Sequence, residues 1–353
     1  MSAYLIVLFL TAAVARVGRH SGNTALRKLS VGIVVLLLTL FAGLRSRTVG
    51  TDTGNYVEIL ASINSYHDVW RTTEIGYNAL MLLSSSLSDG YAALLTMIAF
   101  IVVGSYVAVI LRIIERYETA LFIFIILGTY TFFFNGARQG IATALCFLAI
   151  PSLLERRRLT YFLLICLAAL FHHTALIAAP LYFLAGSRSG WRQLFAIALA
   201  TVILMMFLNI FVQIASILLD DKYAAYAEEG EGGGRVMVTF LVVQGLILYL
   251  IRKSVRDPRQ YYQRLLNIYL IGLVPAVAAT LSNINPSGLL RLSTYFSHSA
   301  ILLWPIVFAG IDGNLIRGLV SLGFFITALA FFVLTTSSFS NLLPYQINPD
   351  FAW

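Results

Sequence analysis

The sequence predicts an all-α, polytopic integral membrane protein, and three observations support this class. Of its 353 residues, 59% are hydrophobic and 11% are charged, whereas soluble domains average about 45–50% and about 25%. Apolar runs of the length that crosses a bilayer recur along the whole chain. The cationic residues also divide unevenly between alternate loops. A water-soluble fold is therefore excluded, and helices are expected because lipid cannot bond free backbone groups.

About twelve membrane passes are expected, two of them short. The stretch 159–186 is the hardest to assign, because cationic clusters flank it on both sides while His172 and His173 lie in its middle. Two short helices that meet at the histidines would keep both clusters on one side, and the sequence leaves open whether the stretch crosses or re-enters. We treat 1–353 as a single transmembrane domain. The clear apolar spans lie near 2–15, 29–44, 91–111, 119–134, 139–154, 193–219, 236–251, 265–282, 296–310 and 317–335.

The charges of the loops predict the orientation. If the first loop is cytoplasmic, most of the 24 Lys and Arg residues lie inside and most of the 16 acidic residues lie outside, as the positive-inside rule requires. Two outer loops are then long, 45–90 and 220–235. The first contains a short apolar stretch, 74–87, that is expected at the outer leaflet, and the second ends in a glycine run that is typical of a flexible linker.

Ionisable residues at the ends of membrane helices are costly and need a reason. Five segments carry them here, and the predicted topology places all five on the outer face: Arg45 to Tyr56, Glu74, Arg138 with Gln139, His172, and Arg291 to Tyr295. Because these segments come from separate parts of the chain, their convergence suggests one site.

Structural roles remain open for each of these residues. Arg45 could anchor a helix end at the interface, and Asp52 and Glu74 could cap the helices that follow them. His172 could simply bond to a neighbouring helix. Arg138 is the least suited to a structural role, because a cation at a helix start opposes the helix dipole.

The residue types indicate the chemistry. Arginine binds phosphate or diphosphate oxygens in a bidentate way, and a histidine or carboxylate can act as a general base. Nucleotide donors from the cytoplasm are not available at an outer face, so the donor is expected to be a lipid that carries its own diphosphate leaving group. We expect no cofactor and no metal, because Asp52 and Glu74 lie in different segments without a paired ligand motif. A nucleic-acid partner is not expected.

Four short motifs also occur in a recognisable order. They are Arg45 with Gly50-Thr51-Asp52 and Tyr56, then Glu74, then Arg138-Gln139, then Phe171-His172 with Thr174-Ala175. In this order the chain resembles the EpsG and Wzy-type polysaccharide polymerases of bacterial inner membranes over Leu44 to Leu181, with a weaker match at Arg291–Phe296. One departure is that Asp52 is followed by Thr-Gly, where an aromatic residue is common in that family.

The resemblance implies a fold related to the multi-pass GT-C glycosyltransferases and a site that faces the periplasm or the cell exterior. The implied reaction transfers a growing glycan from undecaprenyl diphosphate to the next lipid-linked repeat unit. His172 is the expected base, with Asp52 and Glu74 as further catalytic candidates. Expected partners are lipid-linked oligosaccharides, membrane lipids and a chain-length regulator protein. The diphosphate ligands would be Arg45, Arg138 and Arg291, and the substrate contacts would be Tyr56, Gln139 and Tyr295.

Two other functions remain as alternatives. An O-antigen ligase-like transferase would share the diphosphate chemistry but would have a larger outer domain than 220–235. A lipid or oligosaccharide transporter would carry its ionisable residues near mid-membrane, on broken helices repeated in two halves. The sequence does not encode the sugar, the linkage, its stereochemistry or the oligomeric state in any motif that can be read.

Overall fold

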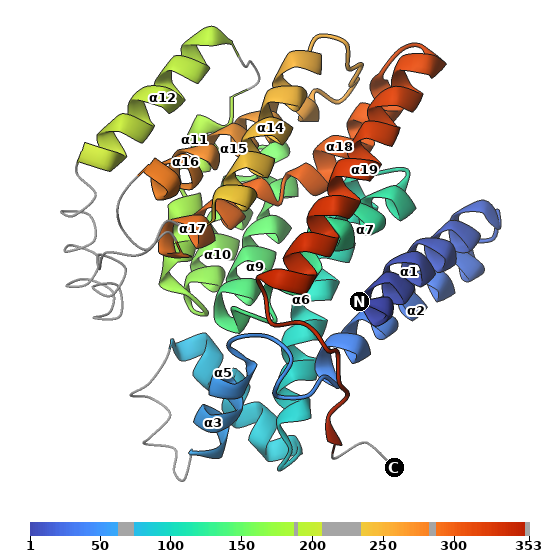
Figure 1. The fold of residues 1–353 in the computed structure, drawn as a ribbon, viewed down its shortest axis with the longest axis vertical. Helices are drawn as coiled ribbons and strands as arrows, with labels where there is room; N and C mark the ends of the chain where they lie inside the picture. The colour runs from blue at the N-terminus through green and yellow to red at the C-terminus, as the bar shows by residue number, and fades with distance from the viewer. Residues whose placement is uncertain (63–73, 187–189, 207–233, 282–286, 350–353) are drawn as a thin grey trace. The chain divides into compact units, whose positions relative to one another are not determined.

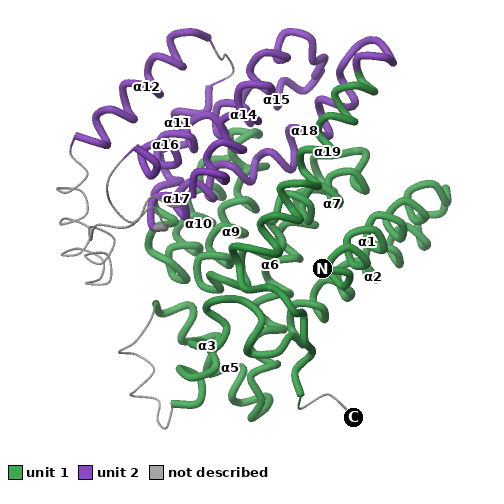
Figure 2. Tube along the Cα trace, in the orientation of Figure 1, with its two compact units in different colours: residues 1–176, 317–353 green, residues 177–316 purple. Residues whose placement is uncertain are grey.

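The computed structural model describes residues 1–62, 74–186, 190–206, 234–281 and 287–349, which divide into two compact units (Figures 1 and 2). Unit 1 comprises residues 1–176 and 317–353, and unit 2 comprises 177–316. Most of the described residues are helical, and the extended pairings among them are isolated bridges, Arg45 with Ile347 and Val255 with Ile311. The all-α class is thus confirmed, whereas the single transmembrane domain stays a prediction.

The helices of unit 1 follow the expected apolar spans closely. Their bounds are α1 (Ser2–His20), α2 (Thr24–Gly43), α3 (Thr53–Ala61), α5 (Ile75–Leu87), α6 (Tyr91–Ile113), α7 (Tyr117–Ile126), α8 (Thr129–Phe132), α9 (Ala137–Leu154), α10 (Arg158–Ala169) and, after unit 2, α19 (Asn314–Ser338).

Unit 2 contains shorter helices. A 3-10 helix, η1 (His173–Ala178), runs across the boundary between the units. The α-helices are α11 (Leu181–Leu184), α12 (Trp191–Met206), α14 (Arg235–Ile251), α15 (Tyr261–Ile271), α16 (Leu273–Leu281), α17 (Ser287–Ser297) and α18 (Ala300–Gly310).

Seven helices in the described part of the chain are long and apolar enough to cross a membrane, and shorter apolar helices accompany them. Two of the seven, Tyr261–Leu281 and Gly288–Gly310, are interrupted, at Gly272 and at His298–Ser299. The second span therefore begins earlier than the apolar run near 296–310 suggested. The chain is a membrane protein, and the count of twelve passes stays a prediction.

Helix α9 forms the centre of unit 1. In its apolar window 89% of the residues are buried, against 22% in that of α19, and it packs against α6 and α10. The outer helices α1, α2 and α19 expose large apolar side chains such as Phe9, Leu36 and Leu322. Exposed apolar side chains on long helices are typical of a surface that faces lipid.

The helix ends of unit 1 gather into two groups. At one end, Arg19 pairs with Glu118, and Arg112 pairs with Glu155. Four helices end or begin near these residues, which were expected in the cytoplasm: α1, α6, α7 and α9. The 18 residues of α9 separate this end from the opposite one by about 27 Å. Arg138 lies at the start of α9, at that opposite end, as the alternation of loops predicted.

The two long loops that are expected on the outer face are described only in part. In the first, α3 and α5 lie together at the lower end of unit 1 in Figure 1, and residues 63–73 lie outside the described residues. The apolar stretch near 74–87 is a helix of 13 residues, α5, as the sequence suggested. Most of the second loop, 220–235, also lies outside the described residues.

Candidate functional site

Glu74 connects two of the other predicted site residues. Its carboxylate lies just before α5 and is buried, with 2% of the side chain exposed. Oε2 accepts a hydrogen bond from Nη1 of Arg138 at 2.6 Å, and Oε1 lies 2.8 Å from Nδ1 of His172. Three segments that are distant in sequence therefore meet at one carboxylate.

A glycine allows α5 to approach the end of α10. The backbone N–H of Gly76 donates to the carbonyl of Leu170 at 2.8 Å. A Cβ atom on Gly76 would lie 2.9 Å from the oxygen and 3.1 Å from the carbon of that carbonyl, which is closer than real Cβ contacts. Glu74 lies two residues before Gly76, and His172 lies two residues after Leu170. The absence of a side chain at Gly76 therefore lets the two backbones come close enough for the carboxylate to reach the imidazole.

The histidine pair lies at a break between helices, as expected. Helix α10 ends at Ala169, and η1 begins at His173. His172 lies in the turn, with 13% of its side chain exposed, whereas His173 is exposed. The structure thus distinguishes the two histidines, since His172 is the one that contacts Glu74.

Tyr56 holds the start of the helix that carries Arg138. Its hydroxyl accepts a hydrogen bond from the backbone N–H of Ala137 at 3.0 Å, which satisfies one of the free donors at the start of α9. The Tyr56 ring also lies against the ring of Tyr77, with centroids 5.8 Å apart. Tyr56 therefore supports the start of the helix that carries Arg138, and its expected contact with substrate stays a prediction.

Asp52 lies directly before α3, and Gln139 lies in the first turn of α9. Asp52 is half-buried at the start of α3, and its Oδ1 accepts a hydrogen bond from the Thr51 hydroxyl at 3.1 Å. Gln139 follows Arg138 in α9 and is buried, with 4% exposed. Next in sequence, Gly140 lets α9 approach Phe133, because a Cβ there would lie 2.2 Å from the Cβ of Phe133.

Arg45 occupies an enclosed position in unit 1. It is 1% exposed, and its Nη1 donates to the carbonyl of Ala42 at 2.5 Å. Nη2 donates to the hydroxyl of Thr53 at 3.3 Å, and the guanidinium lies 4.2 Å from the centre of the Phe134 ring. Burial lowers the pKa of Arg45 to about 10, so it remains cationic at neutral pH. Because its guanidinium is enclosed in this way, Arg45 is better placed to hold α2 and α3 together than to bind a diphosphate.

The structural roles considered for the acidic residues are not the ones observed. Both Asp52 and Glu74 occupy the position that caps a helix, yet neither side chain makes a capping hydrogen bond. Arg45 is also not an interfacial anchor, because its guanidinium points into protein. Arg45 instead bonds to Ala42 at the end of α2 and to Thr53 in α3, and Glu74 contacts Arg138 and His172.

Arg291 and Tyr295 belong to unit 2. Both lie on α17, within the candidate membrane span Gly288–Gly310. Tyr295 is buried, and Arg291 is half-buried. Their participation in the site stays a prediction.

Sequence reasoning missed two residues that shape the site. Gly76 sets the approach of α5 to α10, and Asn135 bonds the turn before α9 to the backbone of Thr51 at 2.8 Å. Gly76 follows Glu74 by two residues, and Asn135 precedes Arg138 by three. A glycine two residues after an acid and an Asn-Gly pair before a helix are signals that the sequence offers for these roles. The sequence gives no signal for the residues that Gly76 and Asn135 contact.

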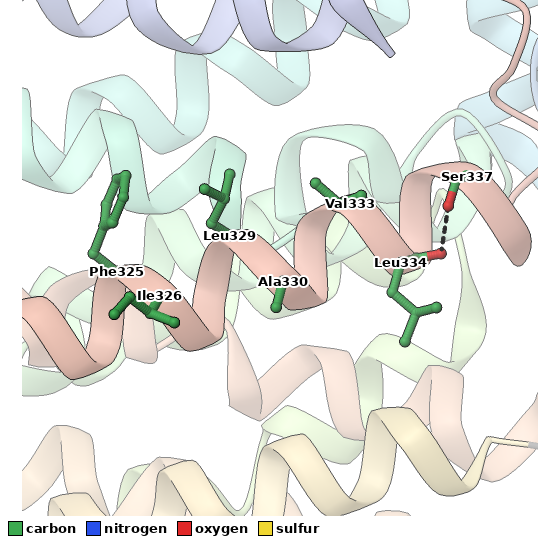
Figure 3. Close-up of a pocket in the computed structure, with 7 residues that line it drawn as sticks. All are labelled: Phe325, Ile326, Leu329, Ala330, Val333, Leu334 and Ser337. Carbon is green, nitrogen blue, oxygen red and sulfur yellow. Dashed lines mark hydrogen bonds between the residues drawn. The ribbon is translucent and has the colours of Figure 1, made fainter.

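Neither a metal-ligand cluster nor the hollow along α19 provides a second site in the described part of the chain. Among the described residues, no group of three or more His, Cys, Asp or Glu side chains could hold a metal ion. A hollow along α19 is lined by residues of that helix alone, from Phe325 to Ser337, and nearly all of them are apolar (Figure 3). This hollow belongs to the apolar surface of the helix and brings no chemical groups together.

Comparison with known proteins gives one result. The sequence model of the EpsG family matches residues 28–347, which is nearly the whole chain. No curated protein and no solved structure matches the chain.

Proposed function

The chain belongs to the EpsG family, and from this premise we propose that it polymerises lipid-linked oligosaccharide repeat units. Membership of the family indicates a role of the polysaccharide-polymerase type in a membrane. The finer proposal is a glycosyltransferase of the bacterial inner membrane that works at its outer face. It would move the glycan from undecaprenyl diphosphate to the next lipid-linked repeat.

The observation that carries this proposal is the buried Glu74 carboxylate between His172 and Arg138. When Glu74 is ionised, Nδ1 of His172 carries the proton and donates a hydrogen bond to Oε1. The other ring nitrogen, Nε2, is then left as an acceptor, which is the form that a general base requires. An acid that fixes the tautomer and stabilises the imidazolium is the arrangement of acid–histidine pairs in other transferases and hydrolases.

The proposed reaction is a displacement at the anomeric carbon of the donor glycan. The acceptor hydroxyl oxygen forms a bond to that carbon, and its proton moves to Nε2 of His172. The bond between the anomeric carbon and the diphosphate oxygen breaks, and its electron pair leaves with undecaprenyl diphosphate. The proton on His172 then passes to solvent.

Arg138 can serve both the base and the leaving group. One of its five N–H donors is used by Glu74, and 22% of its side chain remains exposed. Its charge near the site would stabilise the negative charge that grows on the diphosphate as the bond breaks. Arg291 is proposed as a second diphosphate ligand, on the strength of the sequence pattern.

The transporter alternative finds less support than the transferase. The Glu74, Arg138 and His172 groups gather at one end of the helices of unit 1, rather than halfway along them. A transporter would be expected to hold such groups near mid-membrane. A ligase-like transferase uses the same donor chemistry and differs in its acceptor.

A pair of matched variants tests the proposal in cells. His172→Gln should abolish polymer and leave single-repeat lipid-linked product, because glutamine cannot accept the proton at neutral pH. His173→Gln changes the adjacent exposed histidine and should retain most of the polymer. Electrophoresis of the extracted glycans and lipid-linked intermediates measures both outcomes. Full-length polymer from a His172→Gln strain would reject His172 as the base.

A further inference from the structure

The turn before α9 is attached to two other segments by a single side chain. Oδ1 of Asn135 accepts a hydrogen bond from the backbone N–H of Thr51 at 2.8 Å, and its Nδ2 donates to the carbonyl of Ser340 at 3.0 Å. An amide is suited to this position because it offers an acceptor and a donor at once. Asn135 precedes Arg138 by three residues, and Thr51 precedes Asp52 by one.

The Thr51 loop is packed tightly against this turn. Gly50 has a φ of +96°, and a Cβ there would lie 2.8 Å from the carbonyl oxygen of Phe134 and 2.9 Å from Oδ1 of Asn135. Only glycine satisfies both the left-handed backbone and the close approach. The glycine of the Gly-Thr-Asp motif is therefore explained by its contact with the turn before α9.

The segment 340–348 holds the same loop from the other side. The N–H of Gly50 donates to the carbonyl of Asn341, and the N–H of Ser46 donates to that of Gln346, both at 2.8 Å. The ring of Tyr345 stacks on Phe41 with centroids 4.2 Å apart. The loop thus lies between this segment and the turn, and Asn135 bonds to both.

We propose that Asn135 is a positioning residue that sets Asp52 relative to Arg138 for the transfer reaction. This inference rests on the proposed function. It adds a role for a residue whose hydrogen bonds reach Thr51 and Ser340. If Asn135 loses its amide, the N–H of Thr51 loses its acceptor, and the Thr51–Asp52 backbone can move away from the helix that carries Arg138. Donor and acceptor would still bind, but Asp52, the further catalytic candidate, would be displaced relative to Arg138, and displacement by about 1 Å can cost about 100-fold in rate.

The test uses the full-length protein in lipid nanodiscs with an undecaprenyl-diphosphate-linked repeat unit as substrate. Asn135→Ala should lower kcat by at least about tenfold while KM changes by less than about threefold, and the thermal midpoint should stay close to that of the parent. Asn135→Asp keeps the acceptor for Thr51 but loses the donor to Ser340, so kcat should recover only in part. Asn341→Gly removes a weaker amide contact, 3.4 Å to the carbonyl of Thr48, suits the φ of +47° at this position, and should behave as the parent.

Amide hydrogen exchange supplies a readout that does not depend on activity. Exchange at Thr51 should accelerate in Asn135→Ala and return toward the parent rate in Asn135→Asp. Parent values of kcat and of Thr51 exchange in Asn135→Ala would overturn the inference, as would a loss of activity that only follows a loss of folded protein. If His172→Gln remains fully active, the proposed function fails separately, and the exchange at Thr51 still decides whether Asn135 holds the loop.

Discussion

Glu74 shows how a single residue can hold together three parts of a chain. Its carboxylate is nearly fully buried and meets one cationic and one imidazole partner. Removal of one partner from a buried ion pair typically costs about 3–5 kcal/mol, because the remaining charge stays buried. Substitutions at this site therefore change both stability and chemistry, and the variants must be chosen to separate the two effects.

Arg138→Lys separates charge from geometry. Lysine keeps the positive charge beside Glu74 but loses the planar fork, so we expect the protein to stay folded and the transfer rate to fall at least about tenfold. Arg138→Ala should be nearly inactive and less stable. Rates measured on purified protein, normalised to the folded fraction, check both.

A chelator provides the control for this assignment. If Arg138→Lys keeps the parent rate while EDTA abolishes it, a metal rather than arginine holds the diphosphate. Full activity of the parent in EDTA, together with a slow Arg138→Lys variant, is the result that the arginine assignment requires.

Arg45 should behave differently, because it is enclosed by Thr53, Ala42 and Phe134. Arg45→Ala would leave a cavity and unbonded polar groups, at a cost of roughly 2–5 kcal/mol. We expect less folded protein, while the molecules that do fold keep most of their activity. Thermal unfolding and the rate per folded molecule measure this, and a stable but inactive variant would return Arg45 to the diphosphate site.

At the scale of elements, the positions of the helices followed from the sequence, but their contacts did not. The apolar runs predicted α1, α2, α6 and α9 to within several residues, because long spans must satisfy their own backbone. The approach of α5 to α10 depends on one glycine and one carbonyl, Gly76 and Leu170. Such a contact lies between segments that are almost 100 residues apart, so no periodicity can reveal it.

Gly76→Ala tests this approach. The new methyl group would collide with the carbonyl of Leu170, and overpacking of this kind costs about 1–3 kcal/mol. We expect α5 to shift, the Glu74–His172 contact to lengthen and the transfer rate to fall. The matched control is Gly32→Ala in α2, where a Cβ would meet nothing within 4 Å.

Both glycine variants can be compared by thermal unfolding and by rate. Gly32→Ala should be as stable as the parent or slightly more stable, because alanine favours helix. Equal rates for Gly76→Ala and Gly32→Ala would show that the close approach is not needed for activity.

At the scale of the whole molecule, the orientation in the membrane depends on the charge rule. Cysteine placed at Ser62, next to α3, should react with an impermeant thiol reagent added outside intact spheroplasts, and cysteine at Ser254 should not. Both positions are exposed. The background replaces Cys146 and Cys166, of which Cys166 is also exposed. If the reagent labels Ser254→Cys and not Ser62→Cys, the predicted orientation is wrong.

The candidate site could be predicted only in part from the sequence. The sequence indicated Glu74, Arg138 and His172, because ionisable residues at the ends of membrane helices are few. The structure adds the contacts that join these three side chains. The sequence did not separate residues that support the site from residues that would contact substrate. Tyr56 was expected to contact substrate, and in the structure its hydroxyl bonds to the start of α9. That difference depends on which group each side chain faces, and neither its type nor its spacing carries this information.

The central claim is that the Glu74 cluster, Glu74 with His172 and Arg138, is the reaction centre of a lipid-linked glycan polymerase. The direct measurement is polymer formation by the purified full-length protein in nanodiscs from an undecaprenyl-diphosphate-linked repeat unit, with release of undecaprenyl diphosphate recorded in the same reaction. The parent should produce a ladder of products and one undecaprenyl diphosphate per bond formed. Glu74→Gln, which keeps the shape of the side chain and loses its charge, should produce neither. A ladder from Glu74→Gln equal to that of the parent would contradict the claim.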